Sequence, residues 1–393
     1  MKSMRVLLVT REYPPFEVGG VAKHTFSLAT HLRKIGVDCN VLSFGDPKFS
    51  DENTTFVRPS SSIISRTNAK TGMDSKIPSD IMRFGKIANS MIKSEGYDVV
   101  HVEEPYVGAF VEHKNKVTTV HDTSYGEMKS ILHHPAGFPD IKRALFYLFF
   151  GGYLEMKCMR SSKSVIAPAP HVKDELVKVY GRDKNSISVI SNGVELPDSV
   201  DKKKARHELG VENDQVLVLS ASQHIARKRL DTLIEALKLL NDEGAGGIKV
   251  IMSGDGPLRS INQSLVSRYE LSNIVDMPGW VTEEQLHRYF QAADIYVLTS
   301  EYEAGPISLL EAMARGAAAT SSRIDGFPRY IRHGVDGLLF TTGDYKDLKG
   351  CLERLIDDRK LRANLGEAGR KFASRFSWSK IAEETRNLYE GLA

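Results

Sequence analysis

Short apolar runs rich in β-branched residues recur along this chain, and stretches with a helical spacing of apolar residues separate them. Most of the runs are apolar nearly throughout, which is typical of parallel strands buried on both faces. The first series of predicted strands comprises Arg5–Thr10, Asp38–Phe44, Asp98–Val102, Val117–His121, Ser164–Ala167 and Ser186–Ile190. The second series comprises Val216–Ala221, Lys249–Ser253, Ile274–Met277, Ile295–Thr299 and Ala317–Thr320.

Between these runs, apolar residues recur at the i, i+3, i+4, i+7 spacing of one helix face. One such stripe runs from Leu230 to Leu240, and another runs from Leu348 to Ile356. Strands and helices that alternate in this way predict α/β domains with doubly wound parallel sheets. The segment Ser50–Pro78 is rich in Ser, Thr and Asn and lacks periodicity, so we expect a long loop there.

A segment without periodicity separates the two series of strands. Gly, Pro and charged residues from Asn192 to Asp198 lead into the polar run Ser199–Arg206, which is typical of a hinge or linker. We therefore predict one domain over residues 1–193 and a second over 194–376, followed by a helical pattern over 377–393. Two open α/β domains joined by a hinge imply a cleft, with ligands outside the carboxyl ends of the strands.

Composition and charge exclude several classes of protein. Apolar residues make up 41% of the chain and charged residues 26%, which excludes wholesale disorder and collagen-like structure. The 53 basic and 50 acidic residues give a net charge of +3, too balanced to indicate nucleic-acid binding. Cys39, Cys158 and Cys351 are too far apart for a disulfide framework or a clustered zinc site, so we expect a reducing cytosol.

The longest charge-free apolar stretch is Ala144–Leu154, about half of what a bilayer span requires. It is rich in Phe and Tyr, and the basic residues Lys142, Arg143, Lys157 and Arg160 flank it. Two interpretations stay open: a buried helix with solvated ends, or a helix lying on an anionic membrane surface. The apolar run Val6–Val9 near the N-terminus is too short for a signal peptide.

The segment after the predicted strand Ile295–Thr299 carries candidate chemistry. Pro306 suits the first position of a helix, whose first N–H groups are free to point at an anion. Glu311 lies one turn along this helix and Glu303 precedes it, and carboxylates accept hydrogen bonds from sugar hydroxyls. The candidate anion-binding positions are Gly305, Pro306, Ile307 and Ser308.

Two other loops point to an anionic ligand. Arg227, Lys228 and Arg229 stand before a predicted helix, where cations are unfavourable unless an anion such as a diphosphate arrives. The alternative is a solvated surface cluster. Gly19-Gly20 opens another predicted helix and lets a ligand approach free N–H groups, unless it forms a tight turn without a ligand.

On these residues the chain resembles the retaining glycosyltransferases of family 4 (glycosyl transferases group 1) over nearly its whole length. Glu303 to Glu311 matches the family's Glu-x7-Glu signature. Further matching segments are Gly19–Gly20, Thr119–Asp122, Ile190–Val194, Lys228, Ser253–Pro257, Ala312–Gly316 and Gly334–Leu338. The resemblance implies the GT-B fold, with two Rossmann-like domains facing a cleft, an acceptor-side first domain and a nucleotide-sugar-binding second domain. It also implies that the helix over 377–393 packs back onto the first domain.

The resemblance assigns roles to individual residues. Glu311 would hold the donor ribose, while Trp280 and Val281 would line the nucleobase pocket. The expected catalytic residues are His121 near the reacting sugar, Glu303 beside it, and Lys228 on the diphosphate. The expected donor-binding residues are Gly20, Gln223, Arg227, Lys228, Trp280, Val281, Glu303, Gly305, Pro306, Ile307, Ser308 and Glu311. Gln223 stands where the family usually has an arginine, which leaves Arg227 and Arg229 as candidates for the second charge.

The implied activity is transfer of a hexosyl group from a nucleoside diphosphate sugar to an acceptor hydroxyl, with retention of anomeric configuration. We expect no metal and no cofactor, because the chain lacks an Asp-x-Asp motif. The acceptor (a glycan, a lipid-linked sugar or a small molecule) cannot be read from the sequence. We expect a cytoplasmic protein without a nucleic-acid partner, either free or peripheral on the inner face of the membrane.

Other enzyme classes and one non-catalytic class stay open as alternatives. They are a GT-B sugar-nucleotide epimerase or phosphorylase, a non-catalytic sugar-nucleotide-binding protein, and an NAD-dependent oxidoreductase. The best dinucleotide fingerprint, Gly254–Arg259, lacks the third glycine that the oxidoreductase would need.

Overall fold

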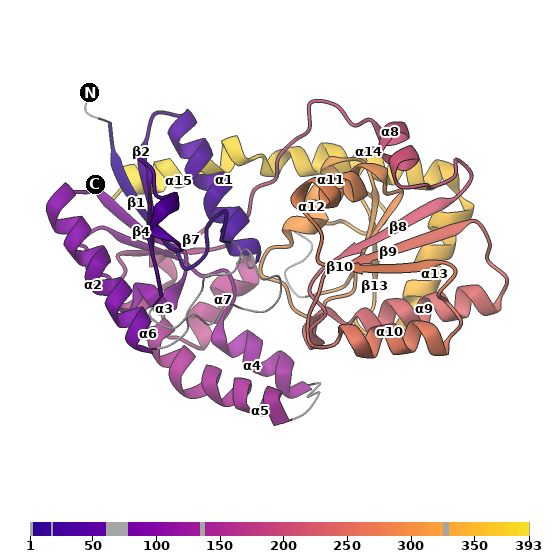
Figure 1. Ribbon diagram of the computed structural model, residues 1–393, viewed down its shortest axis with the longest axis horizontal. Coiled ribbons are helices and arrows are strands. Elements are labelled where there is room, and N and C mark those ends of the chain that lie inside the picture. The colour runs from indigo at the N-terminus through magenta and orange to yellow at the C-terminus, as the bar shows by residue number, and fades with distance from the viewer. Residues whose placement is uncertain (1–2, 17–18, 60–77, 134–137, 325–329, 393) are drawn as a thin grey trace. The chain divides into compact units, whose positions relative to one another are not determined.

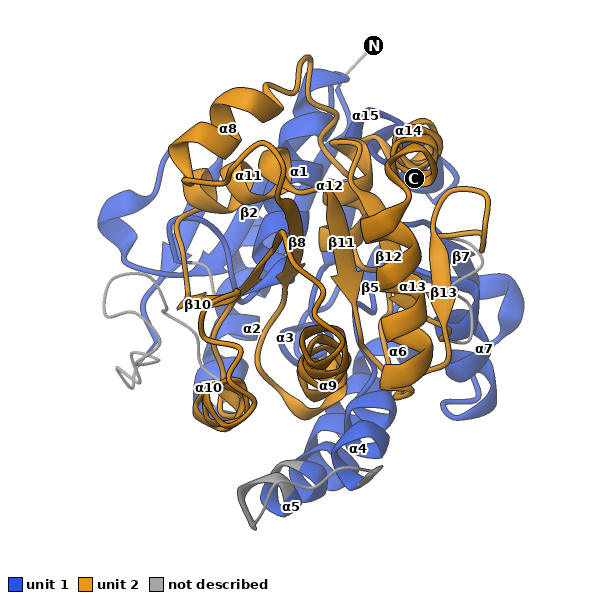
Figure 2. Cartoon of the chain, turned by 90° about the vertical axis from the view of Figure 1, so that its right-hand side faces the viewer, with its two compact units in different colours: residues 1–132, 137–193, 378–393 blue, residues 133–136, 194–377 orange. Residues whose placement is uncertain are grey.

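The computed structural model describes residues 3–16, 19–59, 78–133, 138–324 and 330–392 (Figure 1). Two compact units divide the chain between Gly193 and Val194 and again between Ser377 and Trp378. Unit 1 comprises residues 1–132, 137–193 and 378–393, and unit 2 comprises 133–136 and 194–377 (Figure 2). Each unit is built around one parallel sheet.

The sheet of unit 1 has seven strands in the order β3-β2-β1-β4-β5-β6-β7, and all neighbouring pairs are parallel. The strands are β1 (Arg5–Val9), β2 (Asp38–Phe44), β3 (Thr54–Val57), β4 (Val99–Val102), β5 (Lys116–Thr119), β6 (Ser164–Ala167) and β7 (Ile187–Val189). The helices are α1 (Gly20–Lys34), α2 (Pro78–Glu95), α3 (Pro105–Gly108), α4 (Ser124–His133), α5 (Phe138–Leu145), the π-helix Phe146–Gly151, α6 (Gly152–Arg160), α7 (Pro170–Lys178) and α15 (Trp378–Glu390).

Strand β1 explains why helices cover both faces of this sheet. Val6 and Leu8 belong to an apolar cluster shared with α1 and α15, whereas Leu7 and Val9 belong to a cluster shared with α2. Successive side chains of a strand point to opposite faces, so a run that is apolar throughout needs cover on both sides.

The sheet of unit 2 has six parallel strands in the order β10-β9-β8-β11-β12-β13. The strands are β8 (Val216–Ala221), β9 (Ile248–Ser253), β10 (Val275–Gly279), β11 (Ile295–Leu298), β12 (Ala318–Ser322) and β13 (Leu338–Phe340). The helices are α8 (Lys202–Glu208), α9 (Leu230–Asp242), α10 (Arg259–Arg268), α11 (Glu283–Ala292), α12 (Ile307–Ala314), α13 (Tyr345–Asp357) and α14 (Arg359–Ala373). The predicted stripe from Leu230 to Leu240 is confirmed, because its residues are buried on α9.

Two predictions of irregular structure are wrong in part. The segment Ser50–Pro78 includes strand β3, which pairs with β2 at the edge of the sheet. Its four residues, two of them Thr, are too short a run to indicate a strand by pattern alone. Residues 60–77 of that segment lie outside the described residues.

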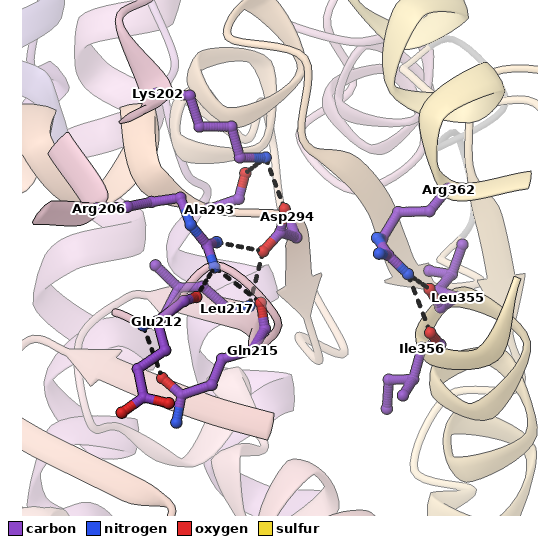
Figure 3. Close-up of polar contacts among 10 residues, drawn as sticks. All are labelled: Lys202, Arg206, Glu212, Gln215, Leu217, Ala293, Asp294, Leu355, Ile356 and Arg362. Atoms are coloured by element: carbon purple, nitrogen blue, oxygen red, sulfur yellow. Dashed lines mark hydrogen bonds and ion pairs between the residues drawn. The ribbon is translucent and has the colours of Figure 1, made fainter. Parts of the chain in front are cut away.

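The polar run Ser199–Arg206 is not a simple linker, because helix α8 begins at Lys202. Its basic residues meet Asp294, which directly precedes β11 (Figure 3). The Lys202 ammonium lies 2.7 Å from one Asp294 oxygen, and the Arg206 guanidinium lies 2.6 Å from the other. The sequence could not reveal this partner, since about ninety residues separate it from the helix.

The buried-helix interpretation of Ala144–Leu154 holds for only one side of the segment. Ala144 and Leu154 are buried, but Leu148, Phe149 and Tyr153 are each more than half exposed. Among the described residues, no helix combines the length and apolarity needed to cross a bilayer.

Candidate active site

Four neighbouring strands of unit 2, β10, β9, β8 and β11, end at the same edge of the sheet. The loops that follow them carry the predicted donor residues of this unit. Trp280 and Val281 follow β10, Gln223, Arg227 and Lys228 follow β8, and Glu303 to Ser308 follow β11. In open α/β sheets ligands bind at this carboxyl edge, so the topology brings the predicted residues to one place.

Two glycines hold the loops after β8 and β9 together. A Cβ on Gly254 would lie 1.9 Å from the Ser222 carbonyl oxygen, and one on Gly256 would lie 2.6 Å from that of His224. Both glycines have positive φ, 130° and 156°. A side chain at either position would therefore push the two loops apart, which explains the glycines of the Ser253–Pro257 motif.

Glu303 is buried in the loop that follows β11 at this edge. Its Oε1 is paired with the Lys228 ammonium and accepts a 2.5 Å hydrogen bond from the Ser300 hydroxyl. The Arg227 guanidinium lies 3.9 Å from Oε2 and donates to the Tyr302 carbonyl at 3.2 Å. Burial would raise the pKa of Glu303, but the Lys228 and Arg227 charges outweigh burial and hold it below its usual range. The carboxylate is therefore ionised and clamped between Lys228 and Arg227.

Arg229 points to different partners. Its guanidinium lies 3.1 Å from Asp231 and 3.8 Å from Glu301. Of the two candidates for the second charge, Arg227 is thus the one that shares Glu303 with Lys228.

Helix α12 starts beside this clamp. Pro306 is its N-cap and adds no side-chain cap, so the prediction that Pro306 occupies the first helical position is off by one residue. The Ser308 hydroxyl accepts a 2.7 Å hydrogen bond from the buried Tyr296. Burial, and next the Glu303 and Glu311 carboxylates, raise the pKa of Tyr296. The negative charges of both signature glutamates therefore affect the same side chain, the buried phenol of Tyr296.

The remaining predicted donor residues of unit 2 differ in exposure. Glu311 is buried, whereas Gln223 and Trp280 are exposed and Val281 is partly exposed. Gly20 and His121 belong to unit 1. Gly20 is exposed at the first position of α1, with open space where a Cβ would stand.

His121, two residues beyond β5, belongs to a cluster around Glu103, which is fully buried after β4. The His121 Nε2 lies 3.1 Å from Glu103 Oε2, and the His24 Nε2 lies 3.6 Å from that same oxygen. The His101 Nδ1 lies 3.5 Å from Glu103 Oε1. One buried carboxylate therefore faces three imidazoles and is hydrogen-bonded to that of His121.

Helix α15 closes this cluster. The Trp378 and His24 rings meet edge to face at 5.0 Å, and the Tyr389 hydroxyl lies 2.6 Å from His101 Nδ1. The other His101 nitrogen lies 2.7 Å from the Thr119 hydroxyl, so both of its ring nitrogens are engaged in the core. His101 is thus a buried core contact.

Burial and hydrogen bonding set the charge of the cluster. Burial lowers the pKa of His24 to about 3 although a carboxylate is adjacent. Burial would raise the pKa of Glu103, but His101, His24 and the hydrogen bond to His121 bring it to about 2. The buried pair Glu103 and His24 therefore carries one negative charge at neutral pH.

The described residues include one group that could hold a metal ion. One ligand atom each of His24, Glu103 and His121 lies within 4.8 Å of the others. The two imidazoles already share one Glu103 oxygen, and the His121 Nε2 stands at hydrogen-bond distance from it. Our expectation of a metal-free reaction stays a prediction.

Two family models match the chain. The model described as Glycosyltransferase Family 4 matches residues 18–197, and the one described as Glycosyl transferases group 1 matches residues 201–372. The chain belongs to glycosyltransferase family 4. Its two doubly wound sheets form the GT-B fold, as predicted. Membership favours glycosyl transfer over the oxidoreductase alternative.

Relatives and solved structures of this family 4 glycosyltransferase extend over its whole length. An uncharacterised glycosyltransferase of Methanocaldococcus jannaschii is 26% identical and covers 98% of both chains. Sucrose-phosphate synthase from Thermosynechococcus elongatus has a TM-score of 0.79 at 19% identity, over 99% of both chains. HepE from Anabaena, solved with UDP-glucose, has a TM-score of 0.73 at 19% identity, over 99% of this chain and 100% of its own.

Sequence reasoning missed several residues of these sites. Ser300 and Tyr296 contact the predicted residues, but hydroxyls are too common for their spacing to stand out. Glu103 and His24 carried a usable signal, since one follows a predicted strand and the other lies one turn into the helix that Gly20 opens.

Proposed function

We propose that this glycosyltransferase moves a hexosyl group from a nucleoside diphosphate sugar to an acceptor hydroxyl with retention of anomeric configuration. The observation that carries the proposal is the convergence of Lys228 and Arg227 on Glu303, directly before α12. Two cations that share one buried carboxylate leave a net positive charge, which can bind a further anion. The free N–H groups in the first turn of a helix favour an anion as well.

In this proposal unit 2 binds the donor. The diphosphate lies against Lys228 and the amides of Ile307 and Ser308, because Pro306 has no N–H to offer. Glu311 accepts hydrogen bonds from the ribose, and Trp280 with Val281 lines the base. Gln223, Arg227 and Gly305 border the phosphates. The neighbour HepE, solved with UDP-glucose, supports this class of donor.

Glu303 acts on the sugar in the same proposal. When the diphosphate takes up Lys228, the carboxylate keeps its contacts with Ser300 and Arg227. Its Oε1, which Lys228 has left, can then accept a hydrogen bond from a hydroxyl of the hexose beside that of Ser300. His121 of unit 1 supplies an imidazole to the reacting sugar, and Gly20 opens the helix on the acceptor-side unit.

The reaction breaks the bond between the anomeric carbon and the β-phosphate oxygen, which keeps the electron pair. The acceptor oxygen bonds to the anomeric carbon on the same face, and its proton passes to the leaving phosphate. The sugar is oxocarbenium-like in between, as in glycosidic cleavage generally. Lys228 and the amides stabilise the charge of the leaving group, and removing such a donor typically costs about 100- to 1000-fold in rate.

The proposal involves no metal and no organic cofactor. It places the reaction in the cytoplasm, in line with three cysteines that are all free and buried. The acceptor is a glycan, a lipid-linked sugar or a small molecule.

A panel of nucleoside diphosphate sugars tests the donor assignment. A bound donor should raise the melting temperature, since a ligand well above its Kd adds kilocalories of stability. The stabilising donor is then incubated with an acceptor library and a chelator, and the product's anomeric configuration is read by NMR. A retained glycoside formed with the chelator present supports the proposal. An epimerised donor, a sugar 1-phosphate, binding without turnover, or no stabilising donor would overturn it.

A further inference from the structure

Exposed large apolar side chains gather on one segment of unit 1. Fifteen such side chains are exposed among the described residues, and five of them fall within thirteen consecutive positions. These five form what we call the apolar ridge: Ile141, Leu145, Leu148, Phe149 and Tyr153, with exposed fractions from 46% to 70%. Such a concentration on a monomer surface marks an interaction site.

The ridge sits on an unbroken helical segment made of α5, the π-helix Phe146–Gly151 and α6. Phe146 and Phe150 turn inward and pack against the core cluster under this sheet face. Gly151 lets the segment approach closely, because a Cβ there would lie 3.0 Å from Ser124 Oγ and from the Tyr106 hydroxyl. The ridge is therefore the outer face of an anchored helix and not a frayed end.

Helix α4 adds to the same end of unit 1. Helices α4 and α5 lie side by side there in both views (Figures 1 and 2). Leu132, near the end of α4, is 55% exposed, and Tyr125 near its start is 38% exposed.

Charge accompanies the ridge. From Phe138 to Lys163 the sequence holds five basic and two acidic residues, which gives a net charge of +3. Lys142, Lys157, Arg160 and Lys163 are exposed. The acidic residue Glu155 is buried and accepts hydrogen bonds from the Ser124 amide at 2.9 Å and the Tyr180 hydroxyl at 2.5 Å. Burial raises the pKa of Glu155 to about 7, which further reduces negative charge here.

We propose that the apolar ridge and its flanking cations dock unit 1 onto an anionic lipid surface. Aromatic and aliphatic side chains on an amphipathic helix enter the headgroup boundary, while Lys and Arg meet the lipid phosphates. A second copy of the chain is the competing occupant. A symmetric dimer contact through the ridge would bring the basic residues of two copies close together, and repulsion between like charges disfavours such a dimer.

The test measures cosedimentation of the full chain with vesicles of phosphatidylcholine alone or mixed with phosphatidylglycerol. The wild-type chain should bind the mixed vesicles and not the neutral ones, and added salt should weaken binding. The variant Leu148→Ser/Phe149→Ser should bind about tenfold more weakly or worse, since each exposed side chain loses its burial in lipid. Ile261→Ser on α10 is the matched control, because Ile261 is 52% exposed and Leu148 is 53% exposed.

A second variant isolates the charge: Lys142→Glu/Arg160→Glu should lose the preference for anionic vesicles. Thermal melting checks that every variant is folded. Wild-type binding to neither vesicle, or equal binding by the Leu148→Ser/Phe149→Ser variant, would overturn the proposal. A third result would also overturn it: the wild-type chain sediments as a dimer and binds no vesicles, and the Leu148→Ser/Phe149→Ser variant is a monomer. The ridge would then be the contact between two copies of the chain. The assay uses neither donor nor acceptor, so its failure leaves the proposed transferase activity untouched.

Discussion

Each unit buries a glutamate carboxylate beyond a central strand of its sheet, Glu303 in unit 2 and Glu103 in unit 1. The side chains that surround these two carboxylates differ in kind. Glu303 in unit 2 is paired with the Lys228 ammonium and the Arg227 guanidinium, which lower its pKa. Glu103 in unit 1 faces the imidazoles of His24, His101 and His121, and burial lowers the pKa of His24 and of His101. Ammonium and guanidinium groups suit a site that receives a phosphate anion. Imidazoles suit a site that orients a hydrogen-bonding group near neutral pH.

The largest effect should come from Glu303 itself. Glu303→Gln removes the charge that Lys228 and Arg227 share, and transfer should fall about 100- to 1000-fold in kcat, as when one preorganised partner is lost. Release of nucleoside diphosphate in the presence of acceptor measures the rate. Glu301→Gln is the control from the same loop, since Glu301 faces Arg229. Comparable rates for Glu303→Gln and wild type would remove Glu303 from the mechanism.

Lys228 tests the cationic side of the comparison. Lys228→Ala should weaken nucleoside diphosphate binding about a hundredfold, because a charge-assisted contact to phosphate is lost while Glu303 stays buried. Titration calorimetry gives the affinity. Arg229→Ala should change it far less, since Arg229 is held by Asp231 and Glu301. Equal losses in both variants would mean that overall charge, and not the clamp, attracts the anion.

The imidazole side should respond to acid. The pKa of His24 is about 3 in the folded chain because of burial, below its ordinary value of 6.5. The unfolded chain therefore binds the proton first, and stability falls as the pH drops from 6.5 toward 3. Between pH 6.5 and 5 this amounts to about 2 kcal/mol. Chemical denaturation at a series of pH values measures it, and His24→Gln should flatten the dependence. An unchanged slope in that variant would assign the acid sensitivity to other groups.

The smallest expected effect concerns orientation of His121. Glu103→Gln keeps a hydrogen-bond acceptor for His121 but removes the charge, so kcat should fall about tenfold with a shifted acidic limb of the pH–rate profile. KM for the donor should stay constant, because the proposed donor residues other than Gly20 lie in unit 2. A purely structural Glu103 would lower the melting temperature and leave the pH profile unmoved.

The same contrast explains what could be predicted from sequence. The proposed donor-binding edge of unit 2 follows from local patterns, since each loop directly follows an apolar run and Glu303 to Glu311 has a fixed spacing. The prediction for Pro306 misses the start of α12 by only one residue, since the helix begins at Ile307 and Pro306 is its N-cap.

The Glu103 cluster has no such spacing. Its members come from α1, β4, the ends of β4 and β5, and α15, so only the tertiary fold unites them. Strand β3 and the pairing of Lys202 with Asp294 were missed for the same reason. Each depends on a partner elsewhere in the fold and not on its own neighbours in sequence.

The placement of Trp378 and Tyr389 has a consequence for biosynthesis. Both residues complete the surroundings of His24 and His101, yet they come after the whole of unit 2 in the chain. A ribosome must therefore translate every strand of the second sheet before the first can enclose its histidines. Nascent chains released before Trp378 should expose the sheet face that α15 covers, and they should need chaperone protection.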